Sequence, residues 1–234
     1  MEGLIVKRGL SGNALKIIAL FSMTLDHVGV MIFPQYVIFR ILGRVAMPVF
    51  AFMIAEGCTY TRRKAVYFGS VFGIGLICVI GYLVSLGTLY LNILITYSFS
   101  IAIIYGLQYA LRSENKAAFL IPTAITLLSV FLNYILPYLT GKDEWSVDYG
   151  FFGTLLPVMI YLVKDFRLKL VSVALGLTLI AINSPLGIVQ WWSFASLLFL
   201  IFYDGTRGKF RLKYLFYIYY PLHIVAIYGV SLLL

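Results

Sequence analysis

The chain has 234 residues, of which 62% are hydrophobic, 17% aromatic and only 12% charged, and its formal net charge is +9. A soluble domain carries about twice that share of charged residues, so the composition excludes a soluble globular protein. The length allows membrane spans joined by short loops, and we predict a single transmembrane domain over residues 1–234.

Apolar stretches near the length that crosses a bilayer core, about 20 residues, recur along the whole chain. They predict an all-α fold, a polytopic membrane helix bundle of about nine transmembrane helices, in which the sixth and seventh are the shortest. The predicted spans are 15–33, 40–59, 66–86, 91–111, 117–137, 150–163, 168–183, 187–203 and 214–233.

The first two predicted spans carry ionisable side chains within their apolar stretches. Asp26 and His27 lie in the first span, and Arg40, Arg44 and Glu56 lie in the second. An ionised side chain at the bilayer centre costs at least about 2.5–3.5 kcal/mol and is rare unless it is paired or functional. Five such groups in one hairpin therefore indicate a functional site.

The spacing of these residues predicts which of them meet. His27 lies seven residues before Pro34, where the chain turns, and Arg40 lies six residues after it. In an antiparallel hairpin the two sit at similar depth, and Arg40 and Arg44, four residues apart, share a helix face. Asp26 is the nearest acid, so we expect an ion-pair cluster of Asp26 with both arginines beside His27, in the outer half of the membrane.

Glu56 lies deeper in the second span. It follows Arg44 by twelve residues, which is about 18 Å along a helix, so the two cannot pair, even with a kink at Pro48. Two interpretations stay open: Glu56 is a structural partner of Arg62 or Arg63 at the inner interface, or it belongs to the active site.

The third and fourth predicted spans carry small and polar residues at helical spacing. Gly69 and Gly73 form a small-xxx-small pair, which allows two helix backbones to approach closely. Asn92, Thr96 and Ser100 fall on one stripe of the fourth span. We interpret this stripe as polar packing between helices in preference to contact with a substrate.

Two histidines are present, His27 and His223. His27 is about twelve and His223 about nine residues from the inner ends of their spans, so both lie near mid-membrane, within about one turn in height. A lone membrane histidine usually makes a hydrogen bond between helices, but two at one depth favour chemistry. Imidazole is the side chain best able to act as acid and base near neutral pH. We predict that His27 is the principal catalytic residue and that His223 assists.

The cations of the loops predict the orientation. With the N-terminus in the cytoplasm, 15 of the 18 Lys and Arg residues fall on cytoplasmic segments, and the other three are Arg40, Arg44 and Lys142. This asymmetry is typical of the positive-inside rule. It predicts a multi-pass protein of the cytoplasmic membrane with the N-terminus inside and the C-terminus outside. It also accounts for most of the net charge, so no nucleic acid partner is expected, and Cys58 and Cys78 lack metal-ligand spacing.

Several segments, spread from end to end, resemble the TraX family of integral membrane proteins. They are Leu15–Ala19 with Asp26–Gly29, Arg40–Phe52 with Glu56–Gly57, Asn92–Thr96, Asp148–Gly150, Tyr203–Gly208, and Lys213–Tyr214 with Phe216–His223. The family is named for a protein that acetylates the N-terminal amine of a pilin subunit. It is similar to the wider group of transmembrane acyltransferases, in which a basic residue and a histidine lie eleven residues apart in one span.

Lys16 and His27 repeat that spacing, which corresponds to about 16 Å along one helix face. Asp204 stands where the family usually has Asn. The resemblance implies an acetyl-CoA-dependent acetyltransferase, with acetyl-CoA as acyl donor and an envelope acceptor that is an amine or hydroxyl of a peptide or glycan. We expect the CoA phosphates to meet basic residues at the inner face, which are Lys16, Arg62, Arg63, Arg207 and Lys209.

Chemistry at this site takes one of two forms. His27 either deprotonates the acceptor or carries the acetyl group itself, and Asp26 orients an imidazole or holds Arg40 and Arg44. Those arginines then bind an anionic acceptor or stabilise the thioester oxyanion. Two other functions stay open, a small proton-coupled transporter, because relays also use intramembrane ionisable residues, and a membrane assembly partner.

Overall fold

The computed structural model describes residues 9–141, 145–209 and 212–234 of the chain. Every regular element of the described residues is a helix, and strand-like pairing is confined there to two isolated bridges, Leu10–Tyr203 and Leu91–Val147. The all-α prediction is confirmed. Four cations used in the orientation argument, Lys7, Arg8, Lys142 and Arg211, lie outside the described residues.

Helices that follow one another directly or across a two-residue turn join into nine segments within the described residues, as predicted. The elements are α1 (Gly12–Met31), α2 (Val37–Gly43), α3 (Ala46–Tyr60), α4 (Lys64–Leu86), α5 (Ile93–Ala110), η1 (Lys116–Phe119), α6 (Leu120–Val130), η2 (Phe131–Ile135), α7 (Leu136–Thr140), α8 (Gly150–Leu162), α9 (Phe166–Ile182), α10 (Ile188–Trp191), η4 (Trp192–Ala195), α11 (Ser196–Leu200) and α12 (Lys213–Ser231).

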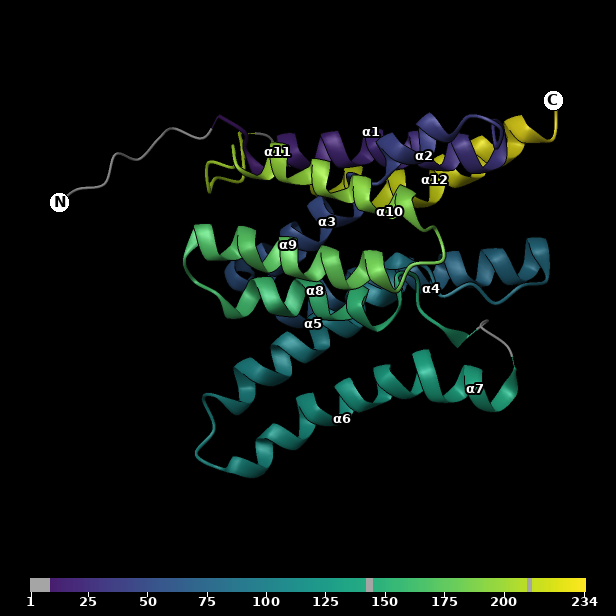
Figure 1. Cartoon of the computed structure of the whole chain (residues 1–234). Helices are drawn as coiled ribbons and strands as arrows, with labels where there is room; N and C mark the ends of the chain where they lie inside the picture. The colour runs from purple at the N-terminus through teal and green to yellow at the C-terminus, as the bar shows by residue number, and fades with distance from the viewer. Residues whose placement is uncertain (1–8, 142–144, 210–211) are drawn as a thin grey trace. The chain divides into compact units, whose positions relative to one another are not determined.

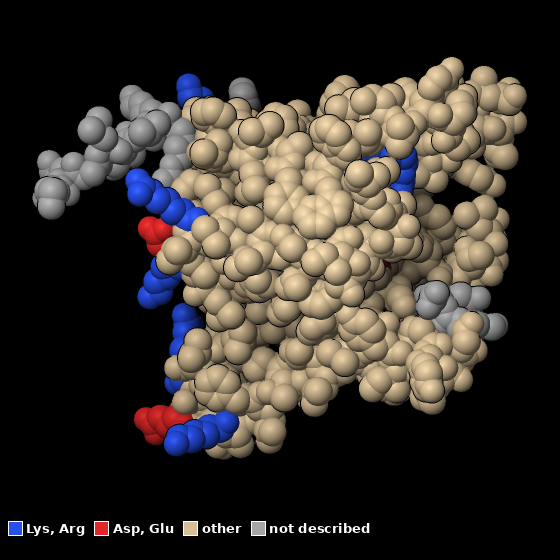
Figure 2. All heavy atoms as spheres, viewed as in Figure 1, with Lys and Arg blue, Asp and Glu red and all other residues tan. Residues whose placement is uncertain are grey.

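Five of these segments are long and apolar enough to cross a membrane: Gly12–Met31, Val37–Tyr60, Lys64–Leu86, Ile93–Ala110 and Lys116–Thr140. Three shorter helices, at Gly150–Leu162, Ile188–Leu200 and Leu215–Ser231, are also apolar. Large apolar side chains such as Val84, Leu198 and Val225 are more than half exposed, and most of the face drawn in Figure 2 carries no charged side chain. A lipid environment accounts for such a surface, and the chain is a multi-pass membrane protein.

The chain divides into two compact units. Unit 1 comprises Met1–Met53 and Pro185–Leu234, and unit 2 comprises Ile54–Ser184, so the boundary falls inside α3. In unit 1, α1 packs against α2 on one side and α12 on another, and α2 also contacts α10 and η4. Figure 1 shows α1, α2 and α12 running alongside one another, although α12 is about 190 residues from α1 in the chain.

The second predicted span is broken into two helices at a specific residue. Helix α2 ends at Gly43 and α3 starts at Ala46, with Arg44 in the turn between them. Pro48 has no N–H to donate to the carbonyl of Arg44, four residues earlier, and a proline of this kind interrupts a helix. The break places Arg44 at a helix end, where its side chain leaves the regular helical surface.

Unit 2 is built around α5, which packs against α4, α6 and α8, while α8 also packs against α9. The predicted polar stripe of α5 serves helix packing, as expected. Asn92 donates to the Gly75 carbonyl at 2.9 Å, Thr96 to the Asp148 carbonyl at 2.7 Å and Ser100 to the Thr154 carbonyl at 2.7 Å. These bonds satisfy buried polar groups between helices.

The glycines of α4 pack differently from the prediction. A Cβ added at Gly69 or Gly73 would meet no atom within 4 Å among the described residues, whereas one at Gly75 would lie 3.1 Å from the Cβ of Leu94. The close approach of α4 to α5 therefore occurs at Gly75. The Gly69–Gly73 prediction was wrong for the described helices, because spacing identifies a small-residue face but not the helix that covers it.

Candidate active site

Three ionisable residues of the first two spans, Asp26, Arg40 and Arg44, form the predicted ion-pair cluster within unit 1. The Asp26 carboxylate pairs with Arg40, whose Nη1 lies 2.7 Å from Oδ2, and with Arg44, whose Nη2 donates to Oδ1. Arg44 also donates from Nε to the Arg40 carbonyl at 3.2 Å and from Nη1 to Oε1 of Gln190 at 3.3 Å. Its side chain is only 3% exposed. One carboxylate shared by two guanidinium groups leaves the cluster with one net positive charge.

Two glycines bring α1 and α2 close enough for these ion pairs. A Cβ on Gly43 would lie 2.7 Å from Cγ of Asp26, closer than real Cβ contacts, and one on Gly29 would lie 2.6 Å from the Cβ of Phe39. The missing side chains let the Asp26 carboxylate lie directly over the α2 backbone. Small residues at helix crossings in membranes commonly have this role.

The two histidines are direct neighbours. Nε2 of His223 lies 3.3 Å from Nδ1 of His27, and the two rings meet edge to face with centroids 4.9 Å apart. Nδ1 of His223 lies 3.0 Å from the Tyr219 carbonyl, and Nδ1 of His27 lies 2.9 Å from the Met23 carbonyl. The expectation of similar depth is confirmed, and α1 and α12 bring the imidazoles into contact.

These hydrogen-bond partners determine which ring nitrogen carries the hydrogen when each histidine is neutral. A carbonyl accepts only, so Nδ1 of each ring must carry the hydrogen that faces its carbonyl. Nε2 of His223 is then an acceptor for the Nδ1 hydrogen of His27. The remaining nitrogen, Nε2 of His27, keeps its lone pair and has no partner among the described residues. Neutral His27 thus presents a nitrogen without a hydrogen, and its tautomer is fixed by the Met23 carbonyl on α1 and by His223 on α12.

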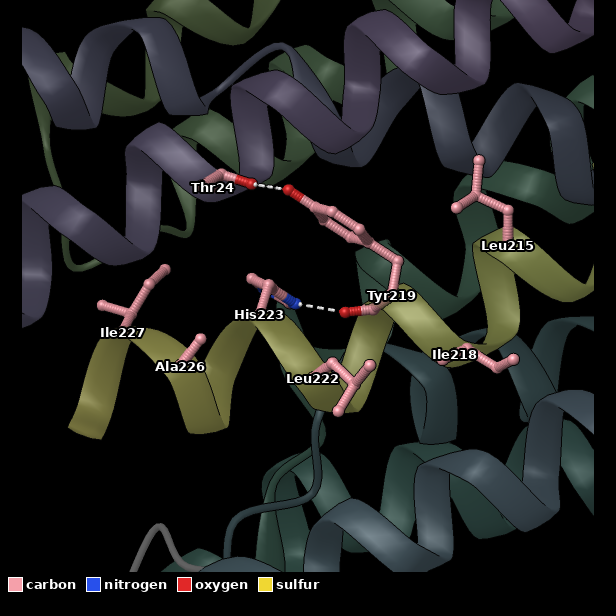
Figure 3. A pocket seen from close by; sticks show the side chains of 8 residues that line it. All are labelled: Thr24, Leu215, Ile218, Tyr219, Leu222, His223, Ala226 and Ile227. Atoms are coloured by element: carbon pink, nitrogen blue, oxygen red, sulfur yellow. Dashed lines mark hydrogen bonds between the residues drawn. The ribbon is translucent and has the colours of Figure 1, made fainter. Parts of the chain in front are cut away.

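A groove runs along α12 next to the histidines. It has a volume of about 470 Å³ and is lined by Thr24, Leu215, Ile218, Tyr219, Leu222, His223, Ala226 and Ile227 (Figure 3). Thr24 donates to the Leu20 carbonyl at 2.9 Å, so its oxygen accepts the Tyr219 hydroxyl hydrogen across 2.6 Å. Tyr219 also stacks on His223, with ring centroids 5.4 Å apart. The groove is apolar apart from these groups.

Lys16 and Arg207 lie at the start of α1. The ammonium of Lys16 lies 5.4 Å from the centre of the Phe216 ring. The backbone N–H of Asn13 donates to the carbonyl of Arg207 at 3.0 Å, which ties the loop after α11 to α1, and Arg207 lies within electrostatic reach of Lys16. Lys209 follows in the same loop and is exposed. Three of the five predicted phosphate-binding cations thus belong to unit 1.

The other three predicted site residues belong to unit 2. Arg62 and Arg63 are exposed in the turn between α3 and α4. Glu56 is buried, and its Oε1 lies 2.5 Å from Nζ of Lys169 on α9. The sequence left two interpretations of Glu56 open, a structural partner of Arg62 or Arg63 and an active-site role. Its ion pair with Lys169 was in neither of them, and the active-site role stays a prediction. Lys169 is 113 residues away in the chain, so sequence proximity could not find it.

Three further polar residues of unit 1 were not singled out from the sequence. Gln190 contacts Arg44, and Thr24 and Tyr219 join across the groove. Two of them had a usable signal: Thr24 lies three residues before His27 and Tyr219 four residues before His223, so each shares a helix face with a histidine. Gln190 carried no local signal.

Comparison with known proteins identifies the chain's relatives. It is 24% identical to the probable fimbrial assembly protein FimC, serogroup H1, of Dichelobacter nodosus, over 96% of this chain and 97% of that protein. It is 50% identical over 40 residues to an uncharacterized protein of Rickettsia prowazekii (strain Madrid E), a match that covers 17% of this chain and 16% of that protein. No solved structure matches. A family model described as TraX protein matches residues 11–231, and the chain therefore belongs to the TraX family.

Proposed function

We propose that this protein is an integral membrane acetyltransferase that moves an acetyl group from cytoplasmic acetyl-CoA to an amine or hydroxyl of an envelope acceptor. The observation that carries the proposal is that Nε2 of His27 has no partner among the described residues, while the Met23 carbonyl and His223 hold the tautomer of the ring. Membership of the TraX family, which is associated with pilin N-acetylation, supports the reaction class.

In the proposed reaction Nε2 of His27 accepts the proton of the acceptor N–H or O–H. The acceptor atom forms a bond to the thioester carbonyl carbon, the C–S bond breaks, and the CoA sulphur leaves with the proton that His27 returns. The imidazolium formed on the way keeps its Nδ1 hydrogen bonded to neutral acceptors. A positioned base of this kind contributes about 10²–10⁴-fold to a rate.

Arg40 and Arg44 supply positive charge for the same reaction. Because Asp26 neutralises only one of them, the cluster favours an anion nearby, either the oxyanion of the tetrahedral intermediate or an acidic group of the acceptor. A guanidinium that is desolvated and fixed by several hydrogen bonds stabilises such charge without reorganising. Lys16, Arg207 and Lys209 in unit 1 are the proposed contacts for the CoA phosphates, and the same role for Arg62 and Arg63 in unit 2 stays a prediction from the sequence.

The groove supports an acceptor that is itself anchored in the membrane. Leu215, Ile218 and Leu222 line it and are about half exposed, so an apolar segment can lie along α12 beside His223. The association of the TraX family with pilin N-acetylation supports the N-terminal amine of a pilus subunit as one such acceptor, and the Dichelobacter relative is named for fimbrial assembly. A lipid-linked glycan hydroxyl is another.

The test uses purified protein in lipid nanodiscs with acetyl-CoA labelled in the acetyl group. CoA release that depends on an added amine or hydroxyl acceptor, together with labelled acceptor, supports the proposal. Absence of CoA binding and of CoA release with every acceptor class overturns it. Label that stays on the protein in the absence of acceptor identifies His27 as an acyl carrier, and its absence identifies a general base.

The acceptor can be found separately. Mass spectrometry of envelope peptides, glycans and lipids from cells with and without the gene is expected to reveal one species that loses an acetyl group. An unchanged acetylation pattern across all three classes contradicts a role in envelope acetylation.

A further inference from the structure

Two hydroxyl groups join α1 to α12 one helical turn before the two histidines. Thr24 donates to the Leu20 carbonyl, so its oxygen accepts the Tyr219 hydroxyl hydrogen across 2.6 Å. Thr24 lies three residues before His27 on α1. Tyr219 lies four residues before His223 on α12, so each hydroxyl shares a helix face with one histidine. The hydroxyl contact and the histidine contact therefore join the same two helices at successive turns.

Tyr219 also holds the His223 ring directly. Its aromatic ring stacks on the imidazole with centroids 5.4 Å apart and an interplanar angle of 8°, and its backbone carbonyl lies 3.0 Å from Nδ1 of His223. Figure 3 shows the Tyr219 side chain reaching from α12 to Thr24 on α1. A hydrogen bond at the tip of the ring fixes the direction of the side chain, so the surface on which His223 packs stays in place.

The rest of α12 constrains the His223 side chain only weakly. Among the described helices α12 packs mainly against α1, and apolar side chains such as Ile218 and Val225 are more than half exposed. Pro221 lies inside α12 between the two contacts, and it has no N–H to donate to the helix. In a bilayer, polar contacts and close packing select how two helices meet, because lipid is as apolar as their side chains. The hydroxyl contact is therefore well placed to keep His223 aligned with His27.

We propose that Tyr219 is a positioning residue, and that its hydroxyl bond to Thr24 holds Nε2 of His223 within hydrogen-bond distance of Nδ1 of His27. In the proposed reaction this contact gives the Nδ1 hydrogen of protonated His27 an acceptor on α12. The effect of Tyr219 on turnover rests on the proposed acetyltransferase function, whereas its effect on the histidine contact does not.

The first test observes the histidine contact itself and needs no activity. The chain has two histidines, so magnetic resonance of the full chain in lipid bilayers, isotope-labelled at its histidine nitrogens and without a histidine tag, reports on those two rings alone. In Tyr219→Phe and in Thr24→Val, the Nε2 signal of His223 is expected to move toward that of an imidazole nitrogen without a hydrogen bond. Thr24→Ser keeps the accepting oxygen and is expected to keep the parent signal. Tyr228→Phe, which removes a hydroxyl elsewhere on α12, is the matched control.

The second test measures turnover with acetyl-CoA and an acceptor. Tyr219→Phe loses one hydrogen bond between membrane helices, and kcat is expected to fall about three- to tenfold with an unchanged KM for acetyl-CoA. The double variant Tyr219→Phe/Thr24→Val is expected to fall no further than either single variant, because both lose the same bond. In a His223→Ala background, Tyr219→Phe is expected to cause no further fall, because Tyr219 acts through His223.

Each other outcome has a defined meaning. Unchanged His223 signals in Tyr219→Phe overturn the proposal, and so does a further fall of kcat in the His223→Ala background. A raised KM for the acceptor with unchanged kcat also overturns it, because the hydroxyl then contacts the acceptor. A parent protein without turnover, whose histidine signals still respond as expected, rejects the proposed function and supports the positioning contact. Unfolding temperatures identify misfolding, and if Tyr219→Phe misfolds, Thr24→Val removes the same bond from the other helix.

Discussion

The two histidines differ in how their nitrogens are used, although they share one depth. Both nitrogens of His223 have partners, the Tyr219 carbonyl and His27, whereas His27 keeps Nε2 unpartnered among the described residues. His223 also stacks on Tyr219 and packs edge to face on Tyr220. In the proposed reaction His27 contributes the reactive atom and His223 orients it.

Replacing His27 by Ala is expected to lower kcat by at least about 10²-fold, because no other base replaces the lost Nε2, while CoA binding and folding persist. His223→Gln is expected to retain more activity than His223→Ala, since an amide oxygen can still accept the Nδ1 hydrogen of His27. The measurement is turnover at saturating acetyl-CoA, with CoA affinity determined in parallel. An inactive His223→Ala beside a largely active His27→Ala would place the catalytic centre on α12 instead.

Arg44→Lys is expected to destabilise the protein and to lower its activity. Lysine keeps the charge but cannot bond Asp26, the Arg40 carbonyl and Gln190 together, because it lacks the planar fork. The loss of one to three hydrogen bonds is expected to cost about 1–3 kcal/mol of stability, together with most of the activity. The measurement is the thermal unfolding midpoint in detergent. Arg112→Lys, at an exposed position, is the control, and equal midpoints for the two variants would contradict the buried network.

At the scale of helices, the site depends on how closely α1 and α2 approach and on where the second span breaks. Glycines 29 and 43 allow the approach, and Pro48 accounts for the break at Arg44. Both features are backbone properties, so they position the side chains before any ligand is present. This preorganisation is what a fixed charge cluster requires.

Gly43→Ala is expected to push α1 from α2 and to disrupt the Asp26 ion pairs. Overpacking of this kind costs about 1–3 kcal/mol, and activity is expected to fall with stability. Gly73→Ala is the matched control, because a Cβ there meets no described atom within 4 Å and alanine favours a helix by about 0.5–1 kcal/mol. Unfolding midpoints and turnover check both variants. An active, stable Gly43→Ala protein would show that the close approach is dispensable.

At the scale of the molecule, the loop cations support the predicted orientation of the chain in the membrane. In unit 2 the turns that follow α3, α5 and α8 carry Arg62 and Arg63, Arg112, and Lys164. These turns alternate along the chain, so an antiparallel order of helices brings them to one side of the bilayer, which the positive-inside rule assigns to the cytoplasm.

A C-terminal reporter is therefore expected outside the cytoplasm, because an odd number of spans follows a cytoplasmic N-terminus. A phosphatase fusion after Leu234 should be active, and the same enzyme inserted between Thr61 and Arg63 should be inactive, with a fluorescent reporter giving the reverse pattern. A cytoplasmic C-terminus would refute the odd count and the orientation, but it would leave the site geometry of unit 1 unaffected.

The sequence by itself determined the features that depend on local periodicity and solvation. Apolar length identified the nine helical segments, because every backbone polar group must be satisfied inside lipid. The spacing of Asp26, Arg40 and Arg44 about the turn at Pro34 predicted their ion pairs, since a short antiparallel hairpin leaves little freedom in register. The equal depth of His27 and His223 followed from counting helical rise from the span ends.

Only the tertiary structure decided which distant helices touch. The His27–His223 contact joins residues 196 positions apart, and Arg44–Gln190 and Glu56–Lys169 join residues 146 and 113 apart. In a membrane every helix presents a similar apolar surface, so hydrophobic pattern cannot select neighbours. Selection comes from small residues and polar pairs that only the folded bundle brings together. For this reason the hairpin cluster was predictable, whereas the contact between the two histidines and the partner of Glu56 were not.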